Sequence, residues 1–326
     1  MTLAPGIRTP EVAEAGPEVG MSEEGDRVSP PTATETGTQP GQFGSNHQDV
    51  STEARPGLTV VMPAYRQAKT IAEDLSRVIG VLASANLDFE IIVVVDGYLD
   101  ETRETASAIA DSEPRVRMLG YQTNRGKGYA VRHGFESARG DLVAFLDAGM
   151  DIDPKALIRA VVAQRTARAD VVIGSKRHPM SVVSYPTIRR IYSGGYQLLT
   201  RLLFGFDVHD TQVGMKLFRR EVIDAVAPRL LVKRFAFDVE LLAVAYLLGY
   251  RRFVEVPVTI VHDGFSSSVR LHSVFEMLWD TMAVWYRAKV RRHYTRIELP
   301  LKTVPYKGIS ENSTGRAGHS VNGASR

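Results

Sequence analysis

The sequence predicts an α/β fold, in which a mainly parallel sheet is flanked by helices. Between residues 57 and 300, short apolar runs alternate with longer amphipathic stretches, as parallel strands joined by helical crossovers do. The runs are apolar at successive positions, which indicates strands buried on both faces of the sheet. The 326 residues are 44% hydrophobic and 24% charged, enough for one large domain or two small ones.

The first half of this core carries the clearest alternation. Leu58–Met62 reads LTVVM and predicts a buried strand, whereas Ile71, Leu75 and Val78 have the spacing of one helix face. Pro154 stands at a helix start, where proline is tolerated. We therefore expect strands at 58–62, 89–95, 116–119, 142–146 and 171–173, and helices at 70–83, 102–110, 128–138 and 154–165.

The pattern loosens after residue 174. We expect helices at 187–204 and 237–248, strands at 216–218 and 253–258, and a last helix at about 273–292 within an amphipathic basic segment, 273–300. That segment has an apolar, Trp-containing body and a cationic end, which favours a helix lying on a membrane surface. A helix packed on the core, or a dimer contact, is the alternative.

Both ends of the chain differ from the core in composition. Residues 1–56 are rich in Pro, Gly, Thr, Ser and Glu and hold nine acids against three arginines, a net charge of −6. We expect this acidic tail, and the similar segment 301–326, to be disordered because neither can bury enough apolar surface. The whole chain carries +3, so the remainder carries +9, which favours an anionic partner such as nucleic acid, a membrane surface or a phosphorylated substrate.

Several classes of protein are excluded by what the sequence lacks. It contains no cysteine, which rules out a disulfide scaffold, a thiolate metal site and a cysteine nucleophile. No stretch reaches the roughly 18 apolar residues of a membrane span. The N-terminus has no basic region followed by an apolar core, so we expect no signal peptide and a cytoplasmic location.

Polar residues follow the predicted strands, where ligands of open α/β sheets bind. They include Asp96 and Asp147, and the run Asn124–Gly128 with Lys127 at its centre. The acids are suited to a divalent metal, and the cation and glycines to phosphates. A Walker loop is excluded because the glycine spacing is wrong, and the first strand is followed by no glycine cluster of the dinucleotide type. These residues together describe a metal–nucleotide site.

The order and spacing of several motifs resemble those of the family 2 glycosyltransferases. The motifs are VVMPAYRQAKTI, IIVVVDGYLDET, NRGKGYAVRHG, ARGDLVAFLDAGMD, GSK, DTQVGMKLFRR, FAFDVELL and EVPV. Within the family they look most similar to the polyprenyl- and dolichyl-phosphate glucose or mannose synthases. The resemblance covers about 58–270 and implies a GT-A (Rossmann-like) fold with a catalytic domain over 57–272.

This resemblance implies a divalent metal, Mg²⁺ or Mn²⁺, on the diphosphate of the donor. The family's Asp-X-Asp run with a further ligand appears here as Asp147, Gly149 and Asp151, so the middle carboxylate is missing. Asp147 and Asp151 remain as metal ligands. The alternative is that these two acids only cap a loop and a helix start.

The resemblance also assigns residues to the donor. The donor-binding set is Pro63, Ala64, Tyr65, Asp96 and Lys127. One acid of the family's Asp-Asp pair is Val95 here, which leaves the base of the nucleotide open. Asp96 could alternatively be a turn residue before Gly97, and Tyr65 a packing residue.

The remaining assignments concern the reaction and the acceptor. The catalytic set is Asp147, Asp210, Gln212, Lys216 and Asp238. The acceptor-phosphate set is Lys176, which replaces the family's arginine, with Arg189 and Ser193 four residues apart on a helix. Arg190 competes with Arg189, and both could instead belong to a solvated helix face. For Asp238, a capping role at its helix N-terminus is the alternative.

The expected function is inverting transfer of a hexose from UDP-glucose or GDP-mannose to a polyprenyl phosphate at the cytoplasmic face of a membrane. The expected partners are the nucleotide sugar, the polyprenyl phosphate and the membrane surface. Nucleic acid is not expected, because the basic residues form no recognisable binding module. The alternatives are transfer to a soluble phosphorylated acceptor or a glycan, and a non-catalytic protein that binds sugar nucleotides.

Overall fold

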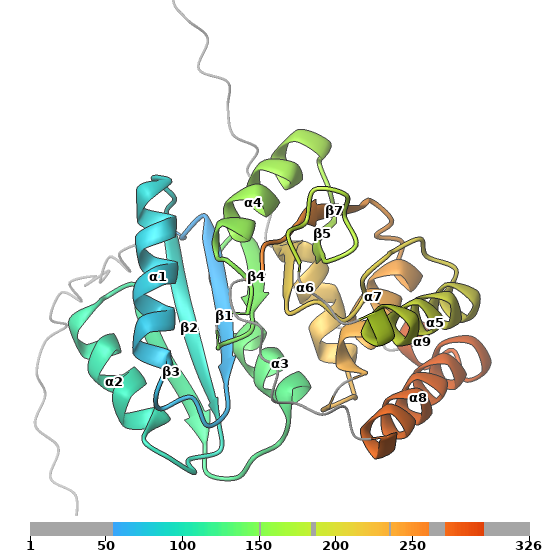
Figure 1. Cartoon of the computed structure of the whole chain (residues 1–326), viewed down its shortest axis with the longest axis horizontal. Helices are drawn as coiled ribbons and strands as arrows, with labels where there is room; N and C mark the ends of the chain where they lie inside the picture. Colours follow the sequence, from blue (N-terminus) through green and yellow to red (C-terminus); the bar gives the residue numbers. More distant parts are fainter. Residues whose placement is uncertain (1–54, 150, 184–186, 235, 261–270, 297–326) are drawn as a thin grey trace, which may run out of the picture. The chain divides into compact units, whose positions relative to one another are not determined.

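The described strands form one seven-stranded sheet in the order β3-β2-β1-β4-β6-β5-β7 (Figure 1). The computed structural model describes residues 55–149, 151–183, 187–234, 236–260 and 271–296. Apart from residues 55–56, the two predicted tails lie outside these ranges. The strands are β1 Leu58–Ala64, β2 Phe89–Asp96, β3 Val116–Tyr121, β4 Leu142–Leu146, β5 Val171–Ser175, β6 Met215–Arg219 and β7 Phe253–Pro257.

Most neighbouring strands are parallel. Val60 of β1 pairs with Ile91 of β2 on one side and with Ala144 of β4 on the other. Strand β6 is antiparallel to both β4 and β5. The strand order reverses between β1 and β4, and ligands of open α/β sheets bind beyond the carboxyl ends of the strands at such a switch point. The predicted α/β fold with a mainly parallel sheet is confirmed.

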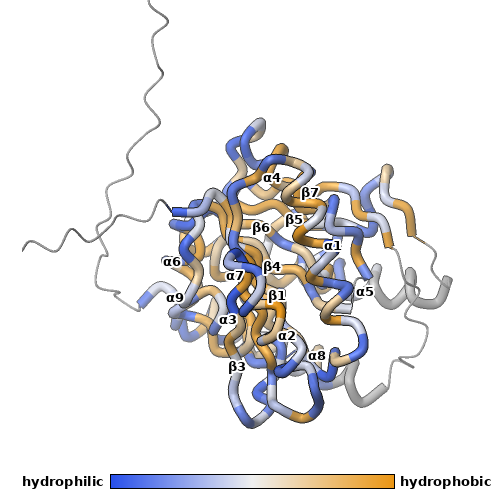
Figure 2. The backbone as a smooth tube through the Cα atoms, turned by 90° about the vertical axis from the view of Figure 1, so that its left-hand side faces the viewer, coloured by the Kyte–Doolittle hydropathy of each residue, from blue (hydrophilic) through white to orange (hydrophobic). Residues whose placement is uncertain are grey.

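Helices cover both faces of the sheet. The long helices of the first five crossovers are α1 Ile71–Ser84, α2 Thr102–Ser112, α3 Lys127–Ser137, α4 Lys155–Ala167 and α5 Thr187–Phe204. Helix α1 packs against α2 and α4 on one face, and α3 packs on β1 and β2 together with α7, Phe237–Leu247, on the other. Figure 2 shows the apolar strands running between these layers. Each strand is buried from both sides, as its continuous apolar character predicts.

One helical segment was absent from the sequence prediction. Helix α6, Arg220–Val226, follows β6 directly and continues into the 3₁₀ turn η1, Ala227–Arg229. Val222, Ile223 and Val226 are buried against the sheet and α7. A helix of seven residues shows only two turns of apolar period, too few to separate it from a loop by pattern alone.

The C-terminal segment is divided into three pieces where the sequence predicts one helix. Helix α8, Leu271–Trp285, leads into the π-helix η2, Tyr286–Val290, and then into the short α9, His293–Arg296. The Arg291 N–H donates to the carbonyl of Tyr286 over 2.9 Å, and Arg292 has a φ of 49°. This left-handed residue turns the chain so that Tyr294 of α9 enters the core, where it is fully buried.

The C-terminal helices lie beside α5 and α7 (Figure 1). Tyr196 of α5 and Thr281 of α8 share a hydroxyl–hydroxyl hydrogen bond of 2.8 Å. Val284 and Ala288 are buried against the core. The C-terminal helices therefore pack on the core, which is one of the two alternatives to a membrane-surface helix. Within the described ranges, no helix has both the length and the apolar character needed to cross a bilayer.

Two helix glycines provide a test of this packing. A Cβ on Gly134 of α3 would lie 2.3 Å from Cγ1 of Val61, whereas a Cβ on Gly80 of α1 would have no described atom within 4 Å. We expect Gly134→Ala to lower the free energy of unfolding by about 1–3 kcal/mol through overpacking. Gly80→Ala should raise it by about 0.5–1 kcal/mol through helix propensity. Urea denaturation of both variants checks the pair; equal shifts would contradict the packing of α3 on β1.

Candidate active site

The carboxyl ends of the central strands gather most of the predicted site residues. Ala64 ends β1, Asp96 ends β2 and Asp147 follows β4. Lys127 is the first residue of α3 and reaches the same edge. Tyr65 follows β1 with 44% of its surface exposed. The predicted donor-binding set and Asp147 are thus brought to one side of the switch point.

The two oxygens of Asp147 have different surroundings. Lys127 Nζ donates to Asp147 Oδ2 over 2.8 Å. Asp147 Oδ1 is buried and has no hydrogen-bond partner among the described residues. The Asp147 N–H donates to the carbonyl of Gly214 over 2.9 Å, and a Cβ on Gly214 would lie 2.2 Å from Oδ2. Glycine at 214 therefore makes room for this carboxylate.

A chain of alternating charges continues inward from Asp147. Lys127 Nζ lies 3.5 Å from Asp238 Oδ2, and Lys216 Nζ donates to Asp238 Oδ1 over 2.5 Å. Lys216 is fully buried and also donates to the carbonyl of Val213 over 2.8 Å. The two ammonium groups lie 5.2 and 5.1 Å from the ring centroid of Phe145, within cation–π range.

Burial and charge act in opposite directions on the two lysines. For Lys127, burial disfavours the ammonium ion, but the carboxylates of Asp147 and Asp238 outweigh burial and raise its pKa. For Lys216, burial lowers the pKa and the nearby charge of Lys127 adds to that effect, against the attraction of Asp238. Lys127, with 26% of its side chain exposed against none for Lys216, is the lysine of the pair that a ligand can reach.

Asp96 is used to hold a loop. Its carboxylate accepts hydrogen bonds from the backbone N–H groups of Arg125, over 2.7 Å, and Gly126, over 2.9 Å. The side-chain amide of Asn124 donates to it over 3.1 Å. Asp96 is 3% exposed. These contacts fix the turn that leads into Lys127. Asp96 therefore does more than form the turn before Gly97, which was the alternative interpretation.

Asp210 and Gln212 lie in the segment that precedes β6. Asp210 Oδ2 accepts the backbone N–H of Lys176 over 3.0 Å, which joins this segment to the end of β5. Glu255 of β7 accepts the backbone N–H of Asp210 over 3.2 Å. In the described part of the chain, Gln212 Nε2 is buried without a hydrogen-bond partner. This amide is available to a polar ligand bound at this edge of the sheet.

The structure does not describe the side chains of the other residues predicted to bind the acceptor phosphate. Arg189 and Ser193 belong to α5, four positions apart, as the sequence predicts. Their side chains, and that of Arg190, lie outside the described part of the structure. The choice between Arg189 and Arg190 therefore remains a prediction.

The metal prediction concerns Asp147 and Asp151. Both lie in the loop between β4 and α4, and Asp151 is exposed. Among the described residues, no three His, Asp or Glu side chains form a cluster that would hold a metal ion. A cation at Asp147 would therefore need oxygen ligands from a bound molecule or water, as Mg²⁺ sites commonly do.

Two anchoring acids were missed by the sequence reasoning. Asp74 of α1 is 2% exposed and accepts the N–H of Gly149 over 2.8 Å, which holds the loop after β4. Burial raises the pKa of Asp74, and the hydrogen bond from Gly149 opposes that rise. Asp74 lies on the apolar stripe of Ile71, Leu75 and Val78, and an acid in such a stripe is the signal that could have identified it. Glu255 offers no comparable signal.

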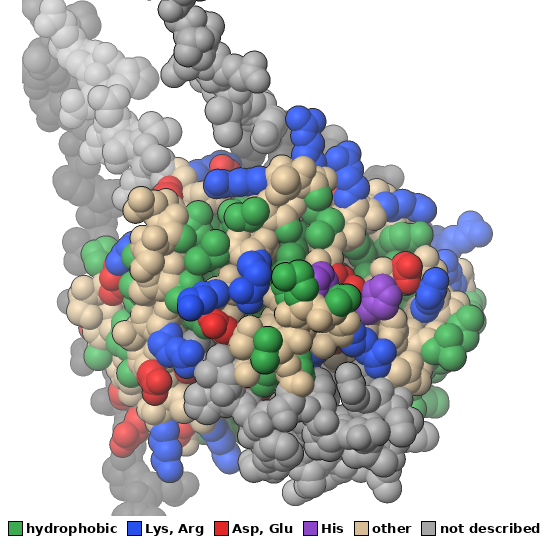
Figure 3. All heavy atoms as spheres, turned by 45° about the horizontal axis from the view of Figure 1, so that its top comes forward, with side chains coloured by type: hydrophobic (Ala, Val, Ile, Leu, Met, Phe, Trp, Pro, Cys, Tyr) green, Lys and Arg blue, Asp and Glu red, His purple; other side chains and the backbone are tan. Residues whose placement is uncertain are grey.

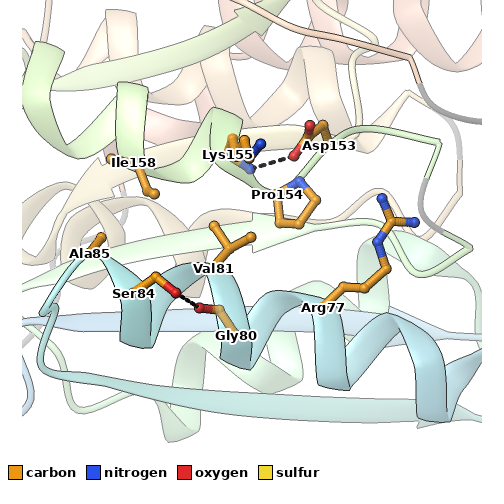
Figure 4. Close-up of a pocket in the computed structure, with 9 residues that line it drawn as sticks. All are labelled: Arg77, Gly80, Val81, Ser84, Ala85, Asp153, Pro154, Lys155 and Ile158. Atoms are coloured by element: carbon orange, nitrogen blue, oxygen red, sulfur yellow. Dashed lines mark hydrogen bonds between the residues drawn. The ribbon is translucent and has the colours of Figure 1, made fainter.

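A separate hollow of about 470 Å³ lies between α1 and α4 (Figure 4). Its lining residues include Arg77, Val81, Pro154 and Ile158. None of the predicted catalytic or binding residues lines it. On the face shown in Figure 3, Lys and Arg side chains are spread widely with acidic side chains among them. Neither surface feature competes with the carboxyl ends of β1, β2 and β4 as the candidate site.

A family model and several curated proteins match this chain, and all of them are glycosyltransferases. The model of glycosyl transferase family 2 matches residues 59–227. Glycosyltransferase AglD of Haloferax volcanii is 31% identical over 249 residues, which are 76% of this chain but only 40% of that protein. A dolichyl-phosphate beta-glucosyltransferase of Trichomonas vaginalis, ALG5C, is 32% identical over 71% of this chain and 72% of its own length. An undecaprenyl-phosphate mannosyltransferase of Micrococcus luteus is 32% identical over 65% of this chain and 86% of its own length.

Solved structures share the fold at lower identity. Mannosyl-3-phosphoglycerate synthase of Rubrobacter xylanophilus superposes with a TM-score of 0.57 at 17% identity, covering 77% of this chain and 79% of that chain. Glucosyl-3-phosphoglycerate synthase of Mycobacterium tuberculosis, solved with Mn²⁺, UDP and glucosyl-3-phosphoglycerate, gives 0.53 at 20% identity over 71% and 79%. At these identities the likeness concerns the fold alone.

The buried pair Lys216–Asp238 yields a stability test that is independent of any ligand. Lys216→Met leaves Asp238 with only the longer contact to Lys127, so we expect a loss of about 3–5 kcal/mol in the free energy of unfolding. The double variant Lys216→Met/Asp238→Asn removes both charges and should recover part of that loss. Urea denaturation measures these two variants and the single variant Asp238→Asn, and a double variant that loses as much free energy of unfolding as the two single variants together would argue against coupling.

Proposed function

Because the chain belongs to glycosyl transferase family 2, we propose that it transfers a hexose, with inversion, from a nucleotide sugar to a polyprenyl phosphate. The donor is UDP-glucose or GDP-mannose, and the reaction takes place at the cytoplasmic face of a membrane. The dolichyl-phosphate glucosyltransferase and undecaprenyl-phosphate mannosyltransferase relatives support a lipid-phosphate acceptor. The observation that carries the proposal is the Asp147 carboxylate at the switch point, with Lys127 bound to one of its oxygens.

The residues around Asp147 fit a divalent metal. Asp147 Oδ1 is buried and makes no hydrogen bond to any described residue, so it can accept a hard cation without breaking a contact. Asp151 of the same loop is the second proposed ligand. When bound, Mg²⁺ or Mn²⁺ would act as a Lewis acid on the departing nucleoside diphosphate. The Mn²⁺ and UDP in the M. tuberculosis structure support this assignment.

The lysines and Asp238 have separate roles in this proposal. Transfer forms a bond from an acceptor phosphate oxygen to C1 of the hexose and breaks the bond from C1 to the diphosphate oxygen. Lys127 stabilises the negative charge that grows on the diphosphate. Asp238 holds Lys127 in place, while Lys216 neutralises Asp238 from the core side. Both Asp238 oxygens contact lysines, so Asp238 is not placed as a general base.

The acceptor requires positioning more than deprotonation. A phosphate oxygen is already anionic at neutral pH, so the site needs to orient it and balance its charge. We assign this role to Lys176, Arg189 and Ser193. Asp210 fixes the backbone at Lys176. We assign the buried amide of Gln212, which has no hydrogen-bond partner among the described residues, to a sugar hydroxyl. Pro63, Ala64 and the half-exposed Tyr65 are assigned to the nucleoside, with Asp96 acting through the loop that it holds.

An apolar stripe on the C-terminal helices supports association with a membrane surface. Trp279, Met282, Tyr286 and Val290 are 71%, 41%, 48% and 54% exposed. Their spacing of three or four residues places them on one face, opposite the buried Val284. Lys289, Arg291 and Arg292, all exposed, lie at its end. An apolar face with a cationic end suits an anionic lipid surface.

A soluble acceptor is the second candidate. The two structural neighbours are named as synthases of sugar phosphoglycerates, so a small phosphorylated acid is the acceptor to test against the lipid. A non-catalytic sugar-nucleotide binder is the third candidate, motivated by Gly149 and Val95 in place of two acids of the family pattern.

The experiment that tests the function is a transfer assay with the purified full chain. It contains Mg²⁺ or Mn²⁺, radiolabelled UDP-glucose or GDP-mannose, and either a short polyprenyl phosphate or 3-phosphoglycerate. We expect label in the organic phase with one donor, lost on addition of EDTA. Label only on the soluble acid would support the second candidate, and donor binding without any transfer would support the third.

The metal assignment predicts the effect of two substitutions. Asp147→Asn should lower transfer by about 10²–10³-fold while the fold stays intact, because it removes a charge that the transition state requires. Gly214→Ala should have a similar effect, since its Cβ displaces the same carboxylate. Asp141→Asn, an exposed acid before β4, is the matched control. Steady-state rates and thermal melting check the set, and full activity of Asp147→Asn would overturn the assignment.

The apolar stripe predicts vesicle binding. We expect the protein to sediment with vesicles containing phosphatidylglycerol, and Trp279→Ser/Tyr286→Ser to lower that affinity about tenfold or more. Val162→Ser is the control, because Val162 is an equally exposed apolar residue on α4. Equal sedimentation of both variants would remove the stripe as the contact surface.

A further inference from the structure

The C-terminal segment reaches the interior of the domain at Glu240. Tyr294 of α9 is fully buried, and its hydroxyl donates to Glu240 Oε1 over 2.6 Å. Arg287 of η2 donates to the same hydroxyl over 3.0 Å, and its guanidinium lies 3.6 Å from Glu240 Oε1. One oxygen of Glu240 is therefore used by the last described helices of the chain.

The other oxygen of Glu240 holds the segment that precedes α7. The backbone N–H groups of Leu231 and Val232 donate to Glu240 Oε2 over 3.0 and 2.7 Å. Burial raises the pKa of Glu240, while the hydroxyl of Tyr294 and these N–H groups oppose that rise. The carboxylate thus joins two segments that are more than fifty residues apart in the sequence.

The segment held by Glu240 lies directly on the loop that carries Lys127. The N–H of Gly128 donates to the carbonyl of Lys233 over 2.9 Å. A Cβ on Gly128 would lie 2.6 Å from the carbonyl oxygen of Val232, and one on Gly126 would lie 2.4 Å from that of Lys233. The two backbones therefore touch on both sides of Lys127, with no space for a side chain between them.

We propose that Glu240 is a positioning residue for the donor site, which transmits the position of the C-terminal segment to Lys127. The path runs from Tyr294 through Glu240 to residues 231–233, and from there to Gly128 and Lys127. The assignment of Lys127 to the donor diphosphate rests on the proposed function, whereas the contacts along the path do not. The C-terminal segment then serves the donor site as well as the membrane surface.

Two conservative variants separate this role from simple packing. Glu240→Gln keeps the shape of the side chain, but an amide has one acceptor oxygen where the carboxylate uses two, so one side of the path loses its acceptor. Tyr294→Phe keeps the buried ring and removes only the hydroxyl donor. The matched controls are Glu221→Gln, on the exposed side of α6, and Tyr250→Phe, whose hydroxyl contacts a carbonyl away from the loop.

The experiment measures the ligand-free full chain and then its binding of nucleotide. Hydrogen–deuterium exchange at residues 126–133 should become about fivefold faster in both Glu240→Gln and Tyr294→Phe, and in neither control. Exchange at residues 89–96 of β2 should not change. By calorimetry with Mn²⁺, the dissociation constant of UDP or GDP should rise about fivefold, and the donor KM should rise likewise with kcat within about twofold.

The readouts separate this inference from the proposed function. Unchanged exchange at 126–133 in Tyr294→Phe would overturn the coupling, even if Glu240→Gln failed to fold. A lower melting temperature with unchanged nucleotide affinity and donor KM would assign Glu240 a structural role only, and would also overturn it. If the wild-type chain bound neither nucleotide, the proposed function would fail, and the exchange measurement alone would decide whether Glu240 positions the loop.

Discussion

Alternating charge at the carboxyl end of β4 is the constraint on which the candidate site depends. Lys216, Asp238, Lys127 and Asp147 follow one another from the fully buried core to a side chain that is more than a third exposed. A buried charge is costly unless an opposite charge or hydrogen bonds compensate for it, and here each member stabilises the charge of the next. The Phe145 ring, close to both ammonium groups, excludes water from the inner part of this chain.

Several acids of the site anchor loops. Asp74, Asp96, Glu240 and Glu255 each accept backbone N–H groups of a neighbouring loop, a charge-assisted contact that orders irregular backbone. Asp147 differs, because its Oδ1 has no hydrogen-bond partner among the described residues. The anchoring acids thereby hold the loops around one carboxylate that is left for a ligand.

The sequence predicts the elements far better than the contacts between them. Strand β4 and helix α5 were predicted with the bounds that the structure has, because apolar period and turn residues are local signals. The antiparallel insertion of β6 was not predicted, since pairing between strands leaves no local pattern. The contact between Lys216 and Asp238, which are 22 residues apart, was not predicted for the same reason. The family resemblance selected both residues but did not indicate that they touch.

The C-terminal segment shows where helical periodicity is insufficient. The apolar stripe is continuous through η2, so it predicts one helix, yet Tyr294 leaves the helical path to reach Glu240. A tertiary hydrogen bond in the core thus decides the end of the helix, and a local pattern cannot indicate it. Glu240 itself resembles a residue in the acidic first turn of a helix, which conceals its contact with Tyr294.

The sheet topology has an evolutionary consequence. The strands and loops from β1 to Asp147, to which we assign most of the donor contacts, come from one uninterrupted stretch of the sequence, whereas α5, β6 and the C-terminal helices all follow it. Mutations and insertions in the later stretch leave the strand pairing among β1, β2 and β3 undisturbed. A gene can therefore diversify α5 and the exposed side of its C-terminal helices, provided that it retains Lys216, Asp238 and Glu240, whose contacts hold Lys127 and its loop from the later stretch.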